Sequence, residues 1–409
     1  MRRLLLLGCV LVAGTSLSAQ QPPPKANPVP WSPEMQTIAV GNNAFACDLY
    51  AHLRTQPGNL FFSPFSVHTA LAMTADGARG ETLDEMVKVL HLPKEAKARL
   101  AAGDVARFYA AGGEGYELAV ANNLWGQQAY PWKADFLERQ RTGYGAELTS
   151  VDFKDAANRE AARRMINASI EKTTRDKIKD MLKASDLTEK TRLVLTNAIY
   201  FKGQWLTEFD KKATKDAPFT LADGTKKDLP LMALESNFRY TETDELQVVE
   251  LPYKGNAITM VVLLPKKHDG LSALEKQLSA KELDAWIRKM GPTRVNLAVP
   301  RFKSENRVQL ADVLAGKMGM KLAFDGNKAD FTGMATTTGG NLYISKVIHQ
   351  SFVEVNEEGT EAAAATAVVV SNFSSLSIPK VFRADHPFLY LIRDTKTGNI
   401  LFMGRYAGS

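Results

Sequence analysis

The residues of this sequence that could act in catalysis or bind metal rarely occur at the spacings of known catalytic or metal-binding motifs. His349 is the best candidate for a general base because it lies between two strand-like runs, and with a Ser and an Asp it would form a hydrolytic triad. However, the sequence contains no G-x-S-x-G elbow, no H-E-x-x-H or C-x-x-C motif, no P-loop and no Rossmann glycine fingerprint. A buried histidine bonded by neighbouring hydroxyl and amide groups is the commoner situation. We therefore predict that the protein is not an enzyme.

The N-terminal residues 1–19, MRRLLLLGCVLVAGTSLSA, have the features of an export signal. Two arginines precede an apolar stretch at residues 4–12, and small residues follow it. A lipoprotein box ending at Cys9 is an alternative, but the apolar segment before Cys9 is short and hydrophobic residues continue past it. We predict a signal peptide cleaved after Ser18 or Ala19 and a secreted or extracellular protein; a periplasmic or lipid-anchored protein is less favoured.

Composition limits the partners and cofactors. The chain has 409 residues, of which 45% are hydrophobic and 23% charged, and no apolar run beyond the N-terminus is long enough to span a membrane. The net charge of +6 falls to +4 without the two signal arginines, and basic residues are mixed with acids, so we expect no nucleic-acid partner. Cys47 is the one cysteine left after processing, and the histidines are scattered. We therefore expect no disulfide, metal or cofactor, and a buried Cys47.

The distribution of patterns along the chain predicts one domain of the α+β class. The Pro-rich segment 20–33 reads as an extended linker, and residues 34–409 as a single domain. Helical patterns predominate to about Leu182, and strand-like runs follow Arg192, interrupted by a helix at about 271–290. Gly-containing turns after Leu221, Tyr253 and Thr397 separate apolar segments and predict hairpins. We expect large, mostly antiparallel sheets with helices packed on one face.

The segment EEGTEAAAATAVVV, which begins at Glu357, has an unusual composition. Every residue from Ala362 to Val370 is small or β-branched. In a strand, alternate side chains share a face, so the following set would be buried together without a large or charged member: Thr360, Ala362, Ala364, Thr366, Val368 and Val370. The alanines also favour a helix or a mobile surface loop, and composition alone leaves both structures open.

The stretch VNEEGTEAAAATA resembles the hinge of the reactive-centre loop in serpins, the serine protease inhibitor superfamily. Seven further stretches resemble serpin signatures in the expected order: NLFFSPFSVHTALAM from Asn59, LTNAIYFKGQW from Leu195, VVLLPKK from Val261, VPRFK from Val299, ISKVIHQSFVEVNEEGTEA from Ile344, FRADHPFLYLI from Phe382 and LFMGRY from Leu401. The resemblance runs from about Glu34 to Tyr406. The chain is thus identified as a member of the serpins, of the inhibitory type.

This resemblance implies a fold with three β-sheets, about nine helices and an exposed reactive-centre loop. It also implies a monomer that acts as a suicide substrate. A target serine protease would cleave the loop and remain covalently attached while the hinge inserts into the main sheet. A non-inhibitory serpin used for storage, chaperoning or carriage is the alternative, and the small hinge residues argue against it.

The resemblance assigns three groups of residues. The hinge comprises Glu357, Glu358, Gly359, Thr360, Glu361, Ala362, Ala363, Ala364 and Ala365. The shutter, a polar cluster beneath the main sheet, comprises Ser63, Ser66, Asn197 and His349, and Trp205 belongs to the breach, where insertion begins. Ordinary core packing with satisfied hydrogen bonds is the other interpretation of the shutter residues.

Two positions of the reactive bond remain open. Counting the usual 17 residues from Glu357 places the bond between Phe373 and Ser374, whereas counting back from Phe382 places it between Leu376 and Ser377. We prefer the first because hinge length fixes how far the protease is carried. Both present a large apolar side chain, which suits the hydrophobic pocket of a chymotrypsin-like protease. A subtilisin-like or elastase-like target would also accept them.

Overall fold

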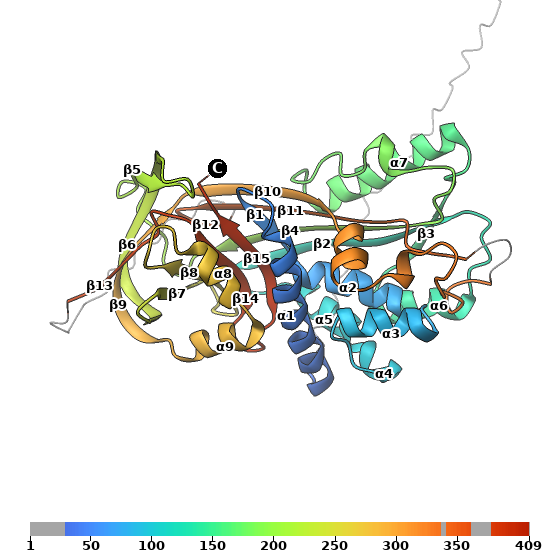
Figure 1. Ribbon diagram of the computed structural model, residues 1–409, viewed down its shortest axis with the longest axis horizontal. Coiled ribbons are helices and arrows are strands. Elements are labelled where there is room, and N and C mark those ends of the chain that lie inside the picture. The colour runs from blue at the N-terminus through green and yellow to red at the C-terminus, as the bar shows by residue number, and fades with distance from the viewer. Residues whose placement is uncertain (1–28, 337–340, 361–377, 409) are drawn as a thin grey trace, which may run out of the picture.

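The computed structural model describes residues 29–336, 341–360 and 378–408 (Figure 1). The predicted signal peptide, most of the linker and several predicted site residues lie outside the described residues. The site residues concerned are Glu361, Ala362, Ala363, Ala364, Ala365, Phe373, Ser374, Leu376 and Ser377.

The described residues form nine α-helices and fifteen strands. The helices are α1 (Pro33–Leu53), α2 (Pro64–Ala75), α3 (Gly80–Val89), α4 (Ala96–Arg99), α5 (Ala101–Ala110), α6 (Ala134–Arg139), α7 (Ala156–Thr173), α8 (Leu271–Gln277) and α9 (Ala280–Arg288). The strands are β1 (Leu60–Phe62), β2 (Tyr116–Gln127), β3 (Leu148–Val151), β4 (Leu193–Gln204), β5 (Lys215–Thr220), β6 (Lys226–Glu242), β7 (Leu246–Pro252), β8 (Ile258–Pro265), β9 (Gly291–Pro300), β10 (Phe302–Gln309), β11 (Lys346–Asn356), β12 (Gly359–Thr360), β13 (Lys380–Arg383), β14 (Phe388–Asp394) and β15 (Ile400–Tyr406).

Local sequence explains where the first helices begin. Ser32 caps α1 by accepting a hydrogen bond from the backbone N–H of Met35, and Ser63 caps α2 in the same way through the N–H of Ser66. Each cap is followed by a proline, whose fixed φ suits the first helical position. Every residue of α2 is buried, so this helix is held by packing on all sides.

The main sheet has six strands in the order β10-β11-β12-β4-β2-β3. Its centre is unusual because β11 and β4 are parallel neighbours over Lys346–Phe352 and Val194–Tyr200, whereas β12 lies between them at one end. The strand β2 runs antiparallel to β4 along its length. The nine residues Leu193–Phe201 of β4 are all buried, as expected for a strand covered on both faces.

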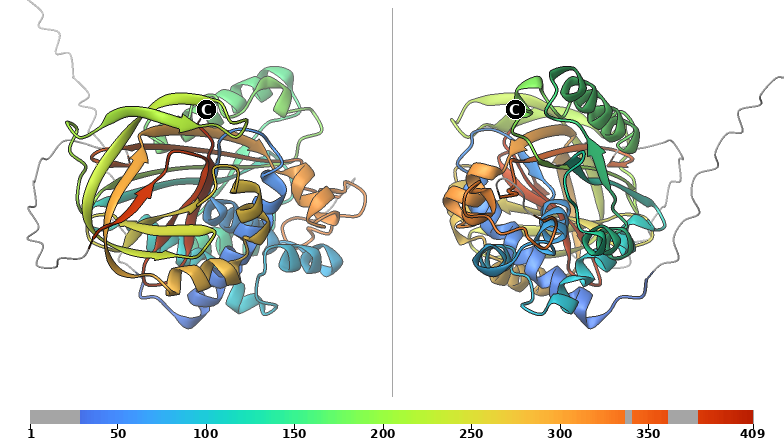
Figure 2. Two further views of the ribbon diagram at one scale, coloured as in Figure 1. Left: turned by 60° about the vertical axis from the view of Figure 1, so that its left-hand side comes forward. Right: turned by 90° about the vertical axis from the view of Figure 1, so that its right-hand side faces the viewer.

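The remaining strands form a continuous nine-stranded network. The long strand β6 divides it into two sheets, because its residues 226–240 pair with β5 and β9 whereas residues 239–242 pair with β7. One sheet therefore comprises β5, β6, β9 and β13, and the other comprises β1, β15, β14, β8, β7 and the end of β6. Counted with the main sheet, these two parts correspond to the three sheets that the serpin resemblance implies, although β6 joins them into one hydrogen-bonded network. Figure 2 shows how β6 and β9 curve around this end of the molecule.

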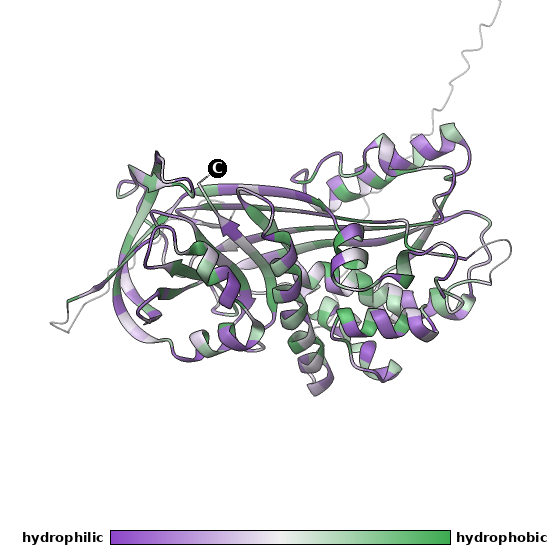
Figure 3. Cartoon of the chain, viewed as in Figure 1, coloured by the Kyte–Doolittle hydropathy of each residue, from purple (hydrophilic) through white to green (hydrophobic). Residues whose placement is uncertain are grey.

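Helices cover both faces of the main sheet, so the prediction of helices on one face was wrong; the buried face of a helix shows in its sequence, but the side of the sheet that it packs against does not. Helix α7 lies on one face, where Ile166 and Ile170 pack with Val194 and Ile348, and α2 and α5 lie on the other (Figure 1). In Figure 3 the surface of α7 alternates between hydrophilic and hydrophobic residues, as expected for a helix that covers a sheet and faces solvent. Cys47 is buried in α1, as predicted, and burial raises the pKa of its thiol to about 12.

The elements differ from the sequence prediction in two places. The helix expected at 271–290 is two helices, because the Ser279 side chain accepts a hydrogen bond from the N–H of Glu282 and begins α9 anew. Strands β2 and β3 lie in the half of the chain where helical patterns predominate. Pairing with distant β4 stabilises β2, and local propensity does not record such long-range contacts.

Candidate functional site

The hinge begins as a tight hairpin at the end of β11. Asn356 accepts hydrogen bonds through Oδ1 from the backbone N–H groups of Glu358 (3.0 Å) and Gly359 (3.2 Å), so its side chain holds a two-residue turn. Strand β12 then returns antiparallel to β11, with Thr360 opposite Val355. On its other side Gly359 lies opposite Gln204 of β4, and Thr360 lies opposite Gly203. The first residues of the hinge thus already occupy a strand position in the main sheet.

Only a glycine fits at position 359. The φ of Gly359 is 155°, within the left-handed half of conformational space that L side chains rarely adopt. A Cβ added there would lie 2.0 Å from the carbonyl oxygen of Gly203 on β4. The close approach of these two backbones therefore depends on glycine at position 359.

Thr360 and Trp205 pack around Tyr253. The Thr360 side chain is buried and lies 2.6 Å from the Tyr253 hydroxyl through Oγ1. The Trp205 ring stacks on Tyr253 with centroids 4.5 Å apart, and its Nε1 donates to the carbonyl of Asn356 at 2.9 Å. Trp205 therefore lies at the end of the main sheet where β12 separates β4 from β11, the place that the resemblance assigned to the breach.

Charged groups fix the turn that carries the hinge. The Glu357 carboxylate is buried; it accepts a hydrogen bond from the Thr214 hydroxyl at 2.8 Å and lies 3.5 Å from the Arg301 guanidinium. Glu358 forms an ion pair with Lys211. All five residues line an open recess of about 720 Å³. Because a buried carboxylate is stable only when it is paired, these contacts hold the turn against the end of β10 and the β4–β5 connection.

The four residues that the resemblance assigned to the shutter lie in contact with one another. His349 accepts a hydrogen bond at Nε2 from the backbone N–H of Ser63 (2.9 Å), so its Nδ1 carries the proton and donates to Oδ1 of Asn197. The histidine is fully buried, and this desolvation lowers its pKa to about 3, against the opposing effect of the Asn197 contact. His349 is therefore neutral, and its hydrogen bond to Asn197 joins β11 directly to β4.

Asn122 joins this polar cluster, although sequence reasoning missed it. Asn122, Asn197 and His349 lie side by side on β2, β4 and β11. The Oδ1 of Asn122 accepts hydrogen bonds from Ser66 Oγ at 2.9 Å and from the Asn197 side chain, whose Nδ2 also donates to Ser66 Oγ at 2.6 Å. The signal that could have identified Asn122 is a polar residue on the same strand face as Leu118 and Leu124.

The shutter geometry excludes a hydrolytic role for His349. Its two ring nitrogens are occupied by Ser63 and Asn197, and neither partner is a carboxylate that would orient a general base. The ring is also inaccessible to a substrate.

Among the described residues, one group of side chains, His268, Asp385 and His386, has the spacing for a metal ion, and it lies on loops of the nine-stranded network. In the same part of the chain, no helix is both long and apolar enough for a membrane span.

Comparison with known proteins shows the family. The family model described as serpin (serine protease inhibitor) matches residues 40–408. The leukocyte elastase inhibitor of Homo sapiens is 39% identical over 387 residues, covering 91% of this chain and 100% of the relative. The chain belongs to the serpin family. Because this family is one of protease inhibitors and the relative is itself named an inhibitor, the protein is not an enzyme.

Solved serpin structures have the same fold. Serpin48 of the insect Tenebrio molitor, described as a highly specific serpin, superposes with a TM-score of 0.81 at 32% identity, covering 93% of this chain and 100% of that one. Human thyroxine-binding globulin, solved with its ligand, gives a TM-score of 0.81 at 28% identity, covering 91% and 98%. The α+β serpin fold predicted from the sequence is thus confirmed.

Replacement of Gly359 tests the fit of the hinge. We expect Gly359→Ala to lower the free energy of unfolding by about 1–3 kcal/mol, because the new methyl group forces β12 away from Gly203. Amide hydrogen exchange at residues 203–204 and 355–356 should become faster. Gly224→Ala is the matched control, since Gly224 also has a positive φ but no atom within 4 Å of its Cβ position. Equal effects of the two substitutions would contradict this account.

The buried His349 predicts a pH dependence of stability. Its pKa is about 3 in the folded chain and about 6.5 in the unfolded one, so the unfolded chain binds an extra proton between these values. Stability should therefore fall as the pH drops below 6.5, with a contribution also from buried His68, whose pKa desolvation lowers to about 4. Thermal denaturation between pH 6.5 and 5 should show a weaker dependence in His349→Gln than in the unmodified protein. An unchanged slope in His349→Gln would refute the assignment.

Proposed function

We propose that this protein is an inhibitor of serine proteases that acts as a suicide substrate and traps its target by inserting the cleaved loop into the main sheet. The observation that supports this most strongly is the position of β12. Gly359 and Thr360 pair with both β4 and β11, so a strand continued from them would run along the line where these two strands meet. The relative named leukocyte elastase inhibitor supports the same activity.

The register of β12 predicts where each inserted residue would lie. Gly359 is opposite Gln204 and Asn356, and every further residue would pair one position earlier on both strands. Thr366 would then lie between Asn197 and His349. An inserted strand ending at Val370 would reach the first residue of β4, Leu193. The segment 361–370 is thus as long as the β4 and β11 strands allow.

The same register assigns the faces of the inserted strand. Thr360 faces the main core, so the alternate residues Ala362, Ala364, Thr366, Val368 and Val370 would face it too. The sequence offers only small and β-branched side chains there. About a dozen new ladder hydrogen bonds at ~1 kcal/mol each, together with burial of these side chains, give a driving force on the order of ten kcal/mol.

The chemical step uses the protease's own catalytic serine. Its Oγ would attack the carbonyl carbon of Phe373, forming an ester as the peptide bond to Ser374 breaks and the new amino group takes up a proton. Insertion of the hinge would then carry the attached protease away and distort its active site before water hydrolyses the ester. Strand β13, paired with β9, would hold the other side of the cut. Cleavage between Leu376 and Ser377 is the alternative.

The large apolar side chain at either bond favours a chymotrypsin-like target, and an elastase-like or subtilisin-like protease would also accept it.

We include export in the proposal: residues 1–19 act as a signal peptide, residues 20–33 as a linker and residues 34–409 as one domain. The protein would act as a secreted monomer. A non-inhibitory role in carriage is the second candidate, favoured by the structural similarity to thyroxine-binding globulin.

A trapping experiment separates these functions. Mixed with chymotrypsin, the protein should form a complex that survives boiling in detergent, because the ester is retained. Thr360→Arg should instead be cleaved without forming the complex, because a charged side chain cannot enter the site beside Tyr253. Thr37→Arg, at an exposed position of α1, should trap like the unmodified protein.

Mass analysis of the released C-terminal fragment should place its first residue at Ser374, and a fragment beginning at Ser377 would support the alternative bond. If the unmodified protein yields only cleavage products with chymotrypsin-like, elastase-like and subtilisin-like enzymes, the proposal fails and the carrier function is favoured.

Thr366→Val tests the proposed register. Insertion separates Asn197 from His349, and the Thr366 hydroxyl would then supply a partner for them. We expect the valine to destabilise the cleaved protein by about 1–3 kcal/mol, the usual cost of an unsatisfied buried polar group, and to leave the intact protein unchanged. Guanidinium denaturation of the cleaved and intact forms measures both. A cleaved variant as stable as the cleaved parent would show that Thr366 lies elsewhere.

A further inference from the structure

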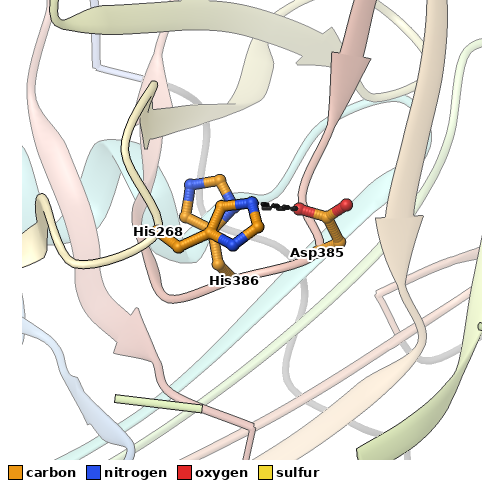
Figure 4. A group of neighbouring side chains, drawn as sticks. All are labelled: His268, Asp385 and His386. Carbon is orange, nitrogen blue, oxygen red and sulfur yellow. Dashed lines mark hydrogen bonds and ion pairs between the residues drawn. The ribbon is translucent and has the colours of Figure 1, made fainter. Parts of the chain in front are cut away.

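Three side chains from two loops meet at the end of β13, away from the hinge and the shutter. His268 lies in the turn between β8 and α8, and Asp385 and His386 lie between β13 and β14. Each offers one ligand atom, and these atoms all lie within 4.8 Å of one another. Figure 4 shows the two imidazole rings beside the Asp385 carboxylate; the rings stack with centroids 4.6 Å apart. The histidines are distant in sequence, so spacing along the chain gave no sign of this group.

The hydrogen bonding of His386 prepares its Nδ1 for a ligand. Its Nε2 lies 2.6 Å from the backbone carbonyl of Pro265. A carbonyl oxygen can only accept, so Nε2 carries a hydrogen and donates it. Nδ1 is hydrogen-bonded to Oδ1 of Asp385 at 2.9 Å, and a metal ion bound by both atoms would replace the proton that they share. A metal-binding histidine usually donates its second ring N–H to a carbonyl or carboxylate in this way, which fixes the ring and its tautomer.

Burial and neighbouring charges orient the other two groups. His386 is buried, Asp385 is partly buried, and the His268 side chain is 60% exposed. Oδ2 of Asp385 is 3.2 Å from Nε of Arg383, which leaves Oδ1 directed at the two histidines. Nε2 of His268 is 4.0 Å from this Oδ1. Two ligands are thus held by their surroundings, and the third is an exposed side chain that can rotate toward them.

From this geometry we propose that His268, Asp385 and His386 bind a divalent transition-metal ion of the Zn²⁺ class. Two imidazole nitrogens and one carboxylate oxygen suit Zn²⁺, Ni²⁺ or Cu²⁺ rather than Mg²⁺ or Ca²⁺, which prefer oxygen ligands. Tetrahedral Zn²⁺ places its ligand atoms roughly 3.3 Å apart, so His268 must approach by about 1 Å and a fourth position stays open to water.

The bound ion would join two segments that the backbone leaves separate. Strand β13 has four residues and pairs with β9 along one edge, and Asp385 and His386 follow directly after it. Coordination by His268 would tie this end of β13 to the β8–α8 turn. The ion should therefore stabilise the fold and slow amide hydrogen exchange in β13. Metal binding does not depend on the proposed protease inhibition, so an experiment can disprove either proposal without affecting the other.

Zinc titration of the untagged full-length protein, freed of metal with a chelator, tests the site. Titration calorimetry should find one Zn²⁺ bound per chain, and excess Mg²⁺ should not displace the bound Zn²⁺. The thermal denaturation midpoint of the protein should be higher with Zn²⁺ than without it. Substitution with Co²⁺ should give the intense visible bands of a four-coordinate ion. His268→Ala should weaken binding by at least about tenfold, and because His268 is exposed, this variant should fold normally.

His91→Ala is the matched control. His91 lies 2.7 Å from a carboxylate oxygen of Asp48 and is also exposed, but no third ligand is near this pair among the described residues. It should bind Zn²⁺ like the unmodified protein. The proposal is overturned if no stoichiometric Zn²⁺ binding occurs, if His268→Ala binds as tightly as the parent, or if His91→Ala loses binding to the same extent.

Discussion

The contact between β4 and β11 is the constraint on which the rest of the structure depends. These strands are parallel neighbours over seven residue pairs, yet β12 already separates them at one end. The sheet thus has an interior seam closed by backbone hydrogen bonds and by the His349–Asn197 contact. An interior seam can open to admit a strand, whereas an edge can only receive one from outside. Hinge, shutter and breach are all placed by this seam.

Polar side chains suit two strands, β4 and β11, that would separate and then pair with an inserted strand. Asn122, Asn197, Ser66 and His349 satisfy one another's hydrogen bonds, and neutral His349 adds no buried charge that would oppose rearrangement. Such a network specifies one arrangement of the strands at little net gain in stability, since each hydrogen bond contributes only about 1 kcal/mol. The energy for the proposed insertion would therefore come from replacing the one parallel ladder between β4 and β11 with two antiparallel ladders, one to each strand.

Sequence reasoning predicted the fold, because serpin-like stretches cover nearly the whole chain, and it named four of the five side chains that meet beneath the main sheet. Composition around Thr360 left strand, helix and loop open. The choice depends on Gly203 and Tyr253, which are far away in sequence and supply the close backbone approach and the buried partner for Thr360. Asn122 was missed because one asparagine in an apolar strand is a weak signal. The division between α8 and α9 rests on one capping serine, a detail that hydrophobic periodicity does not resolve.

The central claim is that the intact fold lies above its lowest free energy until the loop is cut. Calorimetric denaturation of the intact protein and of the same protein nicked in its loop tests this most directly. Insertion of residues 361–370 would replace the single ladder between β4 and β11 with two, so the nicked protein should denature at a much higher temperature. A nicked protein that denatures at or below the temperature of the intact one would contradict the account.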